Sequence, residues 1–244
     1  MTGRLPWAVS ERDLFDALLV LLAFGAGSVD GISFLGLGRV FTANMTGNLV
    51  LLGVAVGRGA SSEVVRSAVA FTAFVAGVFA ATLMADRCAK RRTWPTGVKL
   101  ALAVEAAAQT AFLAGWLASA GRPGTTLEAV LTGASGLAMG LQSGAVIALG
   151  VVGISTTYLT GTLAGLIGEL ATARGSRRDW ARRAALVAAL LVGAACSGLL
   201  VVHARPTAPV LPLAVTVIAL GSGLCVLPRA GDSPALDPPS GWRP

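Results

Sequence analysis

The stretch FTANMTGNLVLLG, from Phe41 to Gly53, decides the fold, because it places polar residues inside one of the most apolar regions of the chain. A similar stretch, STTYLTGTLAGLIG, returns from Ser155 to Gly168. Both are short, both are interrupted by glycine, and both contain a Thr-Gly pair. A chain that twice interrupts its apolar segments in this way needs a structural or functional reason for the interruption.

The composition is typical of an integral membrane protein. Of the 244 residues, 55% are hydrophobic and 13% are charged, and the mean hydropathy is +0.75. A soluble domain carries roughly twice that charged fraction. Only helices and closed barrels can span lipid, and the continuous runs of Leu, Ala, Val and Gly lack the alternation of barrel strands. We therefore expect an all-α helical bundle with the lipid bilayer as its main partner.

Eight apolar segments follow one another along a single membrane domain from residue 14 to residue 227. Residues 1–13 are expected to form a cytoplasmic N-terminal segment, and residues 228–244, rich in Pro, Gly and Ser, a disordered cytoplasmic tail. The segments cover residues 14–37, 41–57, 64–85, 97–120, 127–150, 155–173, 181–203 and 209–227.

Two strongly basic loops limit the topology. They are DRCAKRRTWPTGVK (residues 86–99) and RGSRRDWARR (residues 174–183), and the positive-inside rule places both in the cytoplasm. Three apolar segments, 97–120, 127–150 and 155–173, lie between these two loops. If all three crossed the membrane, the loops would lie on opposite sides of it. The conflict disappears if segment 155–173 makes no net crossing, and by symmetry segment 41–57 behaves likewise. The prediction is six net crossings, both termini inside, and two short broken or re-entrant elements; eight plain spans are the alternative.

An internal repeat supports this topology. Thr46-Gly47 aligns with Thr160-Gly161, and a two-residue gap upstream places Asp30 on Gln142. Residues 14–85 then match residues 127–203, with 97–120 as a linker helix and 209–227 as the last helix. An odd number of crossings separates the units, so the repeats are expected to be inverted. Inverted repeats with interrupted helices are a common plan of transporters, with the site near the midplane.

The phrases GSVDGISFLGLGRVFTANMTGNLVLLG (residues 27–53) and GLAMGLQSGAVIALGVVGISTTYLTGTLAGL (residues 136–166) resemble the YoaK-type family of small bacterial membrane proteins. The resemblance covers about residues 14–227. It implies a multi-pass protein of the bacterial cytoplasmic (inner) membrane, and it supplies neither a substrate nor a reaction.

Two carboxylates lie deep in apolar segments. Asp30 is expected to face the bundle or a wet cavity, because an ionised carboxylate in hydrocarbon costs at least about 2.5–3.5 kcal/mol. We interpret it as a proton- or cation-binding group; the alternative is a structural bond that docks the first segment on the second. Glu105, with Gln109 one turn further, either joins this site or bonds a neighbouring helix.

Further polar residues complete the hypothetical site. Asn44 and Asn48 are four residues apart and are expected on one helix face, where amides suit a neutral polar solute. Thr42 is a candidate cap of a half-helix, whose free N–H groups and dipole favour an anion, and Gln142 is a candidate lining residue. The small residues of the Thr-Gly pairs are interpreted as packing positions at the repeat interface: Thr46, Gly47, Thr160 and Gly161.

An enzyme is not indicated by the sequence. The string GASG at residues 133–136 contains Ser135, but the single histidine, His203, lies beside Arg205-Pro206, in a stretch expected at the membrane interface. A GxSG string without its structural context is weak evidence for an intramembrane serine protease. No cofactor motif and no metal site are indicated, since the three cysteines are far apart.

Two classes of function remain open. The first is a small-solute secondary transporter or permease, with Asp30 as the coupling group. The second is a non-transporting assembly factor, sensor or partner subunit in which the same residues hold helices together. Either class permits a homo-oligomer, and the basic charge is explained by topology and anionic lipid rather than by nucleic acid.

Overall fold

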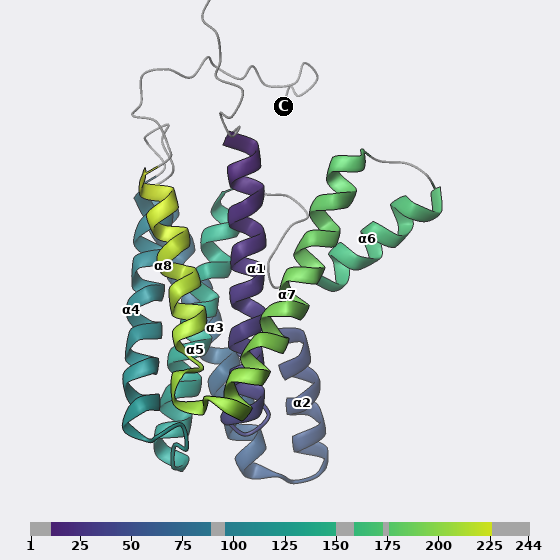
Figure 1. Ribbon diagram of the computed structural model, residues 1–244. Helices are drawn as coiled ribbons and strands as arrows, with labels where there is room; N and C mark the ends of the chain where they lie inside the picture. Colours follow the sequence, from purple (N-terminus) through teal and green to yellow (C-terminus); the bar gives the residue numbers. More distant parts are fainter. Residues whose placement is uncertain (1–10, 89–95, 150–158, 173–175, 226–244) are drawn as a thin grey trace, which may run out of the picture.

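The computed structural model describes residues 11–88, 96–149, 159–172 and 176–225, and within them every regular element is a helix (Figure 1). The prediction of an all-α membrane bundle is therefore confirmed. In chain order the helices are α1 (Glu11–Gly36), α2 (Met45–Gly57), α3 (Ser61–Cys88), α4 (Thr96–Ala118), α5 (Thr125–Ala148), α6 (Leu159–Thr172), α7 (Arg177–His203), the short 3-10 helix η1 (Arg205–Thr207) and α8 (Val210–Cys225).

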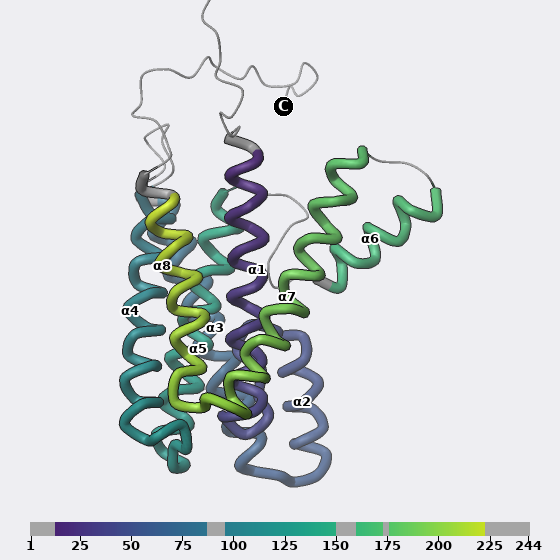
Figure 2. The backbone as a smooth tube through the Cα atoms, in the orientation of Figure 1, coloured from purple at the N-terminus to yellow at the C-terminus, as the bar shows by residue number. Residues whose placement is uncertain are grey.

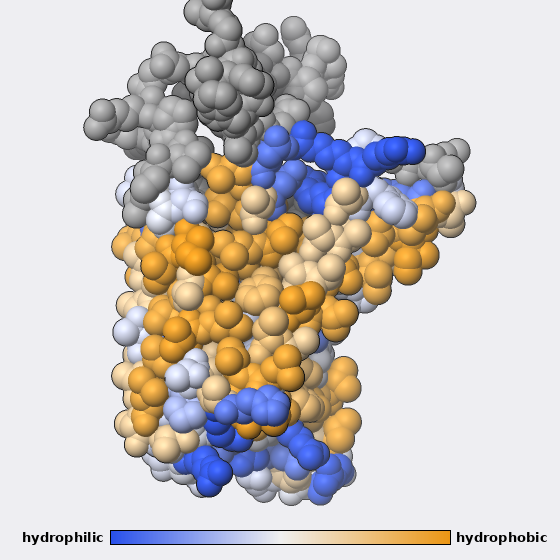
Figure 3. Space-filling view, viewed as in Figure 1, coloured by the Kyte–Doolittle hydropathy of each residue, from blue (hydrophilic) through white to orange (hydrophobic). Residues whose placement is uncertain are grey.

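Six helical stretches in the described part of the chain are long and apolar enough to cross a membrane. They lie in α1, α3, α4, α5, α7 and, with η1, α8. Figure 3 shows an apolar belt on the visible face, with polar residues gathered at both ends. At 1.5 Å per residue, α2 and α6 are each about 20 Å long, which is too short for a hydrocarbon core of about 30 Å. Six spans with two short elements is therefore the observed arrangement, rather than eight plain spans.

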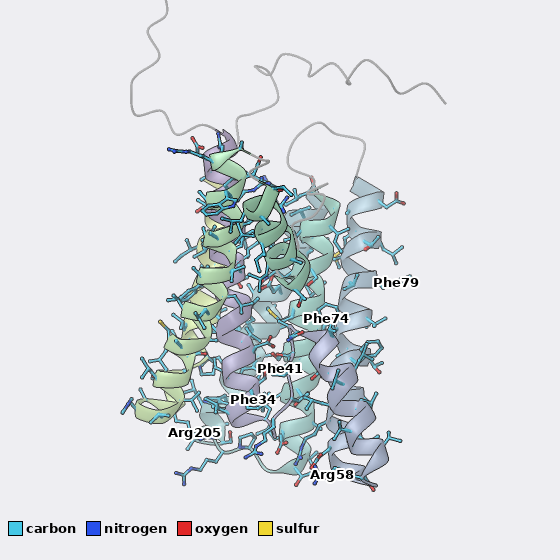
Figure 4. All side chains as sticks on the ribbon, turned by 90° about the vertical axis from the view of Figure 1, so that its right-hand side faces the viewer. Phe34, Phe41, Arg58, Phe74, Phe79 and Arg205 are labelled. Carbon is cyan, nitrogen blue, oxygen red and sulfur yellow. The ribbon has the colours of Figure 1, made fainter. Side chains whose placement is uncertain are left out.

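The two short helices run toward opposite ends of the molecule (Figure 1). The chain turns back after α1, so that Phe41 lies above Phe34 in Figure 4, and their rings stack with centroids 5.1 Å apart. From there α2 runs to the lower end, whereas α6 begins midway along α7 and runs to the upper end (Figures 1 and 2). Residues 150–158, which precede α6, lie outside the described residues. Both short helices thus begin at mid-depth, as half-helices do.

The helices α1 and α5 form the centre of the bundle. Of their most apolar 18 residues, 61% are buried in α1 and 72% in α5, compared with 17–33% in the other four spans. The most extensive packing joins α1 to α7 and α3 to α5, while α4 packs on α5 and α8 packs on α1. The helix α4 therefore occupies beside α5 the place that α8 occupies beside α1. This packing is that of a repeat of four helices, with α4 and α8 in matching places.

Close glycine crossings hold the two main helix pairs together. A Cβ atom on Gly27 of α1 would overlap the carbonyl oxygen of Leu190 in α7, and one on Gly193 of α7 would overlap that of Phe24 in α1. Small residues allow backbones to approach this closely, which is the usual basis of helix packing in membranes.

The second helix pair repeats this crossing residue by residue. Gly140 of α5 lies against the carbonyl of Phe74, and Gly77 of α3 lies against that of Leu137. The same shift in residue number carries Phe24 onto Leu137 and Gly27 onto Gly140, and a second shift carries Phe74 onto Leu190 and Gly77 onto Gly193. These shifts place Asp30 on Ser143, one residue from the Gln142 expected from the sequence. The two placements differ by one residue because the helix crossings fix the register directly, whereas the sequence alignment depended on the length of the gap upstream of the Thr-Gly pairs.

Charged residues lie at both ends of the bundle. The last turn of α3 and the first turns of α4 and α7, which border the two basic stretches, all lie at the upper end (Figure 1). Arg182 of α7 pairs with Asp16 of α1 at 3.3 Å, and Arg183 pairs with Glu169 of α6 at 3.0 Å. This shared end is what the charge distribution of the loops required.

Candidate functional site

Asp30 holds the start of the half-helix α2. Its Oδ1 atom accepts hydrogen bonds from the backbone N–H groups of Thr42 at 2.9 Å and Ala43 at 2.7 Å, and its Oδ2 atom accepts one from Asn44 at 3.0 Å. The carboxylate thus complements the positive end of the α2 dipole, where free N–H groups favour an anion. The structure brings Asp30 to the backbone of Thr42 and Asn44.

The two asparagines hold the local backbone. Asn44 is the N-cap of α2 and accepts a hydrogen bond from the N–H of Gly47 at 3.2 Å, so the cap is Asn44 rather than Thr42. Asn48 is 1% exposed; its Oδ1 atom accepts from the N–H of Phe41 at 2.9 Å, and its Nδ2 atom donates to the Phe41 carbonyl and to the Met45 sulfur. Both asparagines therefore fix the turn that precedes α2.

Thr42 links this turn to the central helix α5. Its hydroxyl oxygen lies 2.8 Å from that of Ser135, and both side chains are buried. Ser135 is the serine of the GASG string, considered from the sequence only as a nucleophile. His203 is exposed at the C-terminal end of α7. A polar residue on a glycine-rich helix face was the signal that could have identified Ser135 as a partner of the half-helix.

A small cavity lies beside Ser135 in the centre of the bundle. Its volume is about 20 Å³, which leaves room for one water molecule. Gln109 of α4 and Ser135 are polar residues of its wall, and its remaining lining residues are Val29, Ile32, Phe112, Ala138, Met139, Pro209 and Pro212.

Glu105 forms a buried polar cluster with Gln109 and Thr216 of α8. The Oε1 atom of Glu105 accepts from Gln109 Nε2 and from Thr216 Oγ1, both at 2.9 Å, and Gln109 Nε2 also lies 2.9 Å from Thr216 Oγ1. Glu105 is fully buried. Its Oε2 atom and the Oε1 atom of Gln109 have no hydrogen-bond partner. The sequence had indicated Glu105 and Gln109 but not Thr216. A single threonine in an apolar helix is common in membrane proteins, so the sequence pattern does not mark it as part of a polar cluster.

The remaining predicted residues lie apart from this centre. Gln142 is buried in α5 and donates to the Leu22 carbonyl of α1 at 3.3 Å. The Thr-Gly pairs are not packed on each other, because α2 packs on α3 and α6 packs on α7. Within the described residues, Thr46 of α2 is exposed, as are Thr160 and Gly161 of α6. The expectation of a shared interface is corrected, since the half-helices lie toward opposite ends; Gly47 instead lies against Phe41 and Asn44.

A larger cleft opens at the lower end, where Arg58 is marked in Figure 4. It has a volume of about 450 Å³ and lies between the turn after α1, the helix α2 and the start of α3; its walls include Arg39, Arg58, Arg66 and Glu63. Arg66 pairs with Glu128 of α5 at 2.5 Å, and Arg58 lies 3.7 Å from Glu63.

Arg39 has an uncommon backbone conformation in this cleft. Its φ is +63°, in the left-handed region, and it follows Gly38 with a φ of +75°. For a residue other than glycine this conformation is strained, and such strain is found at functional sites. Arg39 is therefore held at the wall of the cleft at an energetic cost.

Six spans, two half-helices and a polar centre define a polytopic membrane protein of the helical-bundle class. The chain belongs to a family described as "Protein of unknown function (DUF1275)", whose model matches residues 18–222. It is 43% identical over 155 residues to the UPF0700 transmembrane protein YoaK of Bacillus subtilis (strain 168), which covers 64% of this chain and 67% of that relative. No solved structure matches the chain. The resemblance seen in the sequence is thus confirmed.

Proposed function

We propose that this protein is a secondary transporter or permease that moves a small polar or charged solute across the bacterial inner membrane. The observation that carries the proposal is the pair of half-helices, α2 and α6, which begin at mid-depth and run to opposite ends (Figure 1). Matched glycine crossings relate the helix pairs that hold them. Broken helices in inverted repeats form the midplane site in several transporter folds.

The polar centre supports a solute path past the start of α2. Thr42, Ser135 and Gln109 line or adjoin the small cavity, and the start of a half-helix supplies a positive dipole end. In this proposal the described conformation is closed at its centre, where there is room for about one water. An open conformation would separate the turn before α2 from α5 and expose the hydroxyls of Thr42 and Ser135.

The cleft at the lower end supports an anionic solute. Three arginines and one glutamate lie in its walls, so its charge is positive. Guanidinium groups bind carboxylate and phosphate oxygens in pairs. We infer that the upper end, where the helices that border the two basic stretches begin or end, faces the cytoplasm. The cleft then faces away from the cytoplasm and receives the solute from outside.

Side-specific labelling tests the transport proposal without knowledge of the solute. Single-cysteine variants at Thr42 and Ser135, in a background with Cys88, Cys196 and Cys225 replaced by serine, are treated with an impermeant maleimide in right-side-out and inverted vesicles. A transporter exposes both positions to at least one side, and addition of its solute changes the rate. A cysteine at Arg58, whose side chain is 67% exposed at the lower end, is the positive control. Labelling of position 58 alone contradicts the proposal.

A second function is favoured by the bonding of Asp30 and Asn48. Both are fully engaged by the backbone of residues 41–44, and Asp30 and Asn48 are absent from the lining of the central cavity. A non-transporting assembly factor, sensor or partner subunit needs no more than such helix-docking bonds. This function predicts a centre that stays unlabelled under all conditions, and no flux of small organic anions in proteoliposomes.

A further inference from the structure

Glu105 differs from the other buried polar groups because half of its carboxyl group is unsatisfied. Two side chains donate to Oε1, none donates to Oε2, and the side chain is 0% exposed. An unpaired carboxylate is strongly disfavoured in an apolar environment, and such a group usually becomes neutral instead. The atom that lacks a partner therefore marks where a ligand of Glu105 binds.

Among the described residues, the helices packed around Glu105 place no cation beside it that would balance a negative charge. The helix α8 (Val210–Cys225) has no Asp, Glu, Lys, Arg or His, and Glu128, the charged residue of α5, is paired with Arg66 near the lower end. On α4 itself Lys99 lies six residues earlier, more than a full turn away. The charged residues of α3 lie in its first two turns and its last turn: Glu63, Arg66, Asp86 and Arg87. On η1, which also packs against α4, Arg205 donates to the Gly121 carbonyl beyond the end of α4.

A proton suits this site better than a metal ion does. Sodium-like and divalent cations need several oxygen ligands around them, and calcium takes six to eight. Glu105 is surrounded by one amide, one hydroxyl and apolar side chains, and the described residues contain no cluster of acidic, histidine or cysteine side chains that could hold a metal. A proton on Oε2 needs no such cage. It makes the group neutral, and Gln109 Oε1 is an unpartnered acceptor one turn along.

We propose that Glu105 is a proton-binding group within the membrane and that it, rather than Asp30, couples proton movement to transport. The coupling rests on the proposed transport function; the proton binding does not. Gln109 connects the proton site to the start of α2. It donates to Glu105 and also lines the small cavity. Ser135 lines the same cavity and bonds Thr42 at the start of α2. Loss of the proton makes the carboxylate a stronger acceptor for the Gln109 N–H, which now also lies against Thr216, and the resulting shift of the Gln109 side chain changes the wall of the cavity beside the half-helix.

Infrared spectroscopy of the full-length protein in lipid tests the proton site directly. A protonated carboxylic acid has a C=O stretching band that an ionised carboxylate lacks. We expect this band in the wild type, its loss in Glu105→Gln, and its retention in Asp30→Asn. Thr216→Val removes a hydrogen bond to Oε1 and is expected to shift the band. The site assignment is overturned if the wild type lacks the band, or if Glu105→Gln retains it.

The shift of the infrared band in Thr216→Val keeps the proton site testable even if Glu105→Gln does not fold.

A second measurement separates the coupling of proton movement from transport itself. In proteoliposomes with an internal pH dye, a panel of small organic anions is screened for solute-dependent proton movement. Glu105→Gln is expected to lose proton movement while keeping solute exchange. Proton movement that survives in Glu105→Gln refutes the coupling. Absence of any flux in the wild type, with the infrared band present, refutes the proposed function and leaves the proton site standing.

Discussion

Asp30 and Glu105 are both carboxyl groups inside long apolar helices, yet their donors differ in kind. Asp30 is held by the backbone N–H groups of three successive residues, on both of its oxygens. Glu105 receives two side-chain donors on one oxygen and none on the other. Backbone donors at a helix start are fixed, and they stabilise a permanent negative charge. Side-chain donors can rotate away, so a group that they hold can change its protonation state. We therefore regard Asp30 as a structural anchor and Glu105 as the functional carboxyl.

The largest effect is expected from removing the anchor. Asp30→Ala leaves the N–H groups of residues 42–44 without their acceptor, and each buried unsatisfied group costs about 1–3 kcal/mol. The folded protein is expected to lose at least about 3 kcal/mol, seen as a large drop in the melting temperature in detergent and in the yield of monodisperse protein.

The matched comparison for Asp30→Ala is Glu105→Gln. It keeps the shape of the side chain and replaces an oxygen that has no partner, so we expect a change of less than about 1 kcal/mol. Asp30→Asn keeps one acceptor and is expected to lie between the two. Equal destabilisation by Asp30→Ala and Glu105→Gln would contradict the division of roles between the two carboxyl groups.

The next largest effect is expected at Asn48. Asn48→Leu retains the volume but removes two hydrogen bonds to the backbone of Phe41, which is only partly exposed. The expected cost is about 2–3 kcal/mol, measured as a lower melting temperature. Asn44→Ser, which preserves an N-cap side chain, is the control and should cost only a few tenths of a kcal/mol. A solute-binding Asn48 would show the reverse pattern, with lost flux and an unchanged melting temperature.

The sequence was sufficient for the class of fold and for the interrupted elements, because both depend on local hydropathy, glycine and charge. Loop charges alone indicated that the segment around Thr160-Gly161 does not cross. The partners of the polar residues could not be predicted, because they depend on which helices meet: Thr42 with Ser135, and Glu105 with Thr216. The four-helix repeat was missed for the same reason, since α4 and α8 match in their packing and not in a shared motif.

The bond between Thr42 and Ser135 joins the anchored turn to α5, on the path toward Glu105. Thr42→Val and Ser135→Ala are each expected to cost about 1 kcal/mol, because each leaves one buried hydroxyl without its partner. The double variant should cost less than the sum of the two, with a coupling of about 0.5–1 kcal/mol. Simple additivity of the two melting-temperature changes would show that the turn and α5 are not coupled through this bond.

The smallest effect, and the only one of opposite sign, is expected at Arg39, on the same turn as the Asp30 anchor. Glycine adopts a positive φ without strain, so Arg39→Gly is expected to stabilise the protein by about 1 kcal/mol or slightly less. The same change removes a positive charge from the cleft wall and is expected to weaken protection of the protein by organic anions in thermal melts. Arg39→Lys separates the two effects, because it retains the charge and the strain and should behave like the wild type in stability. If Arg39→Gly raises the melting temperature and leaves anion protection unchanged, the strain has no role in binding, and the cleft is not the entry site for an anionic solute.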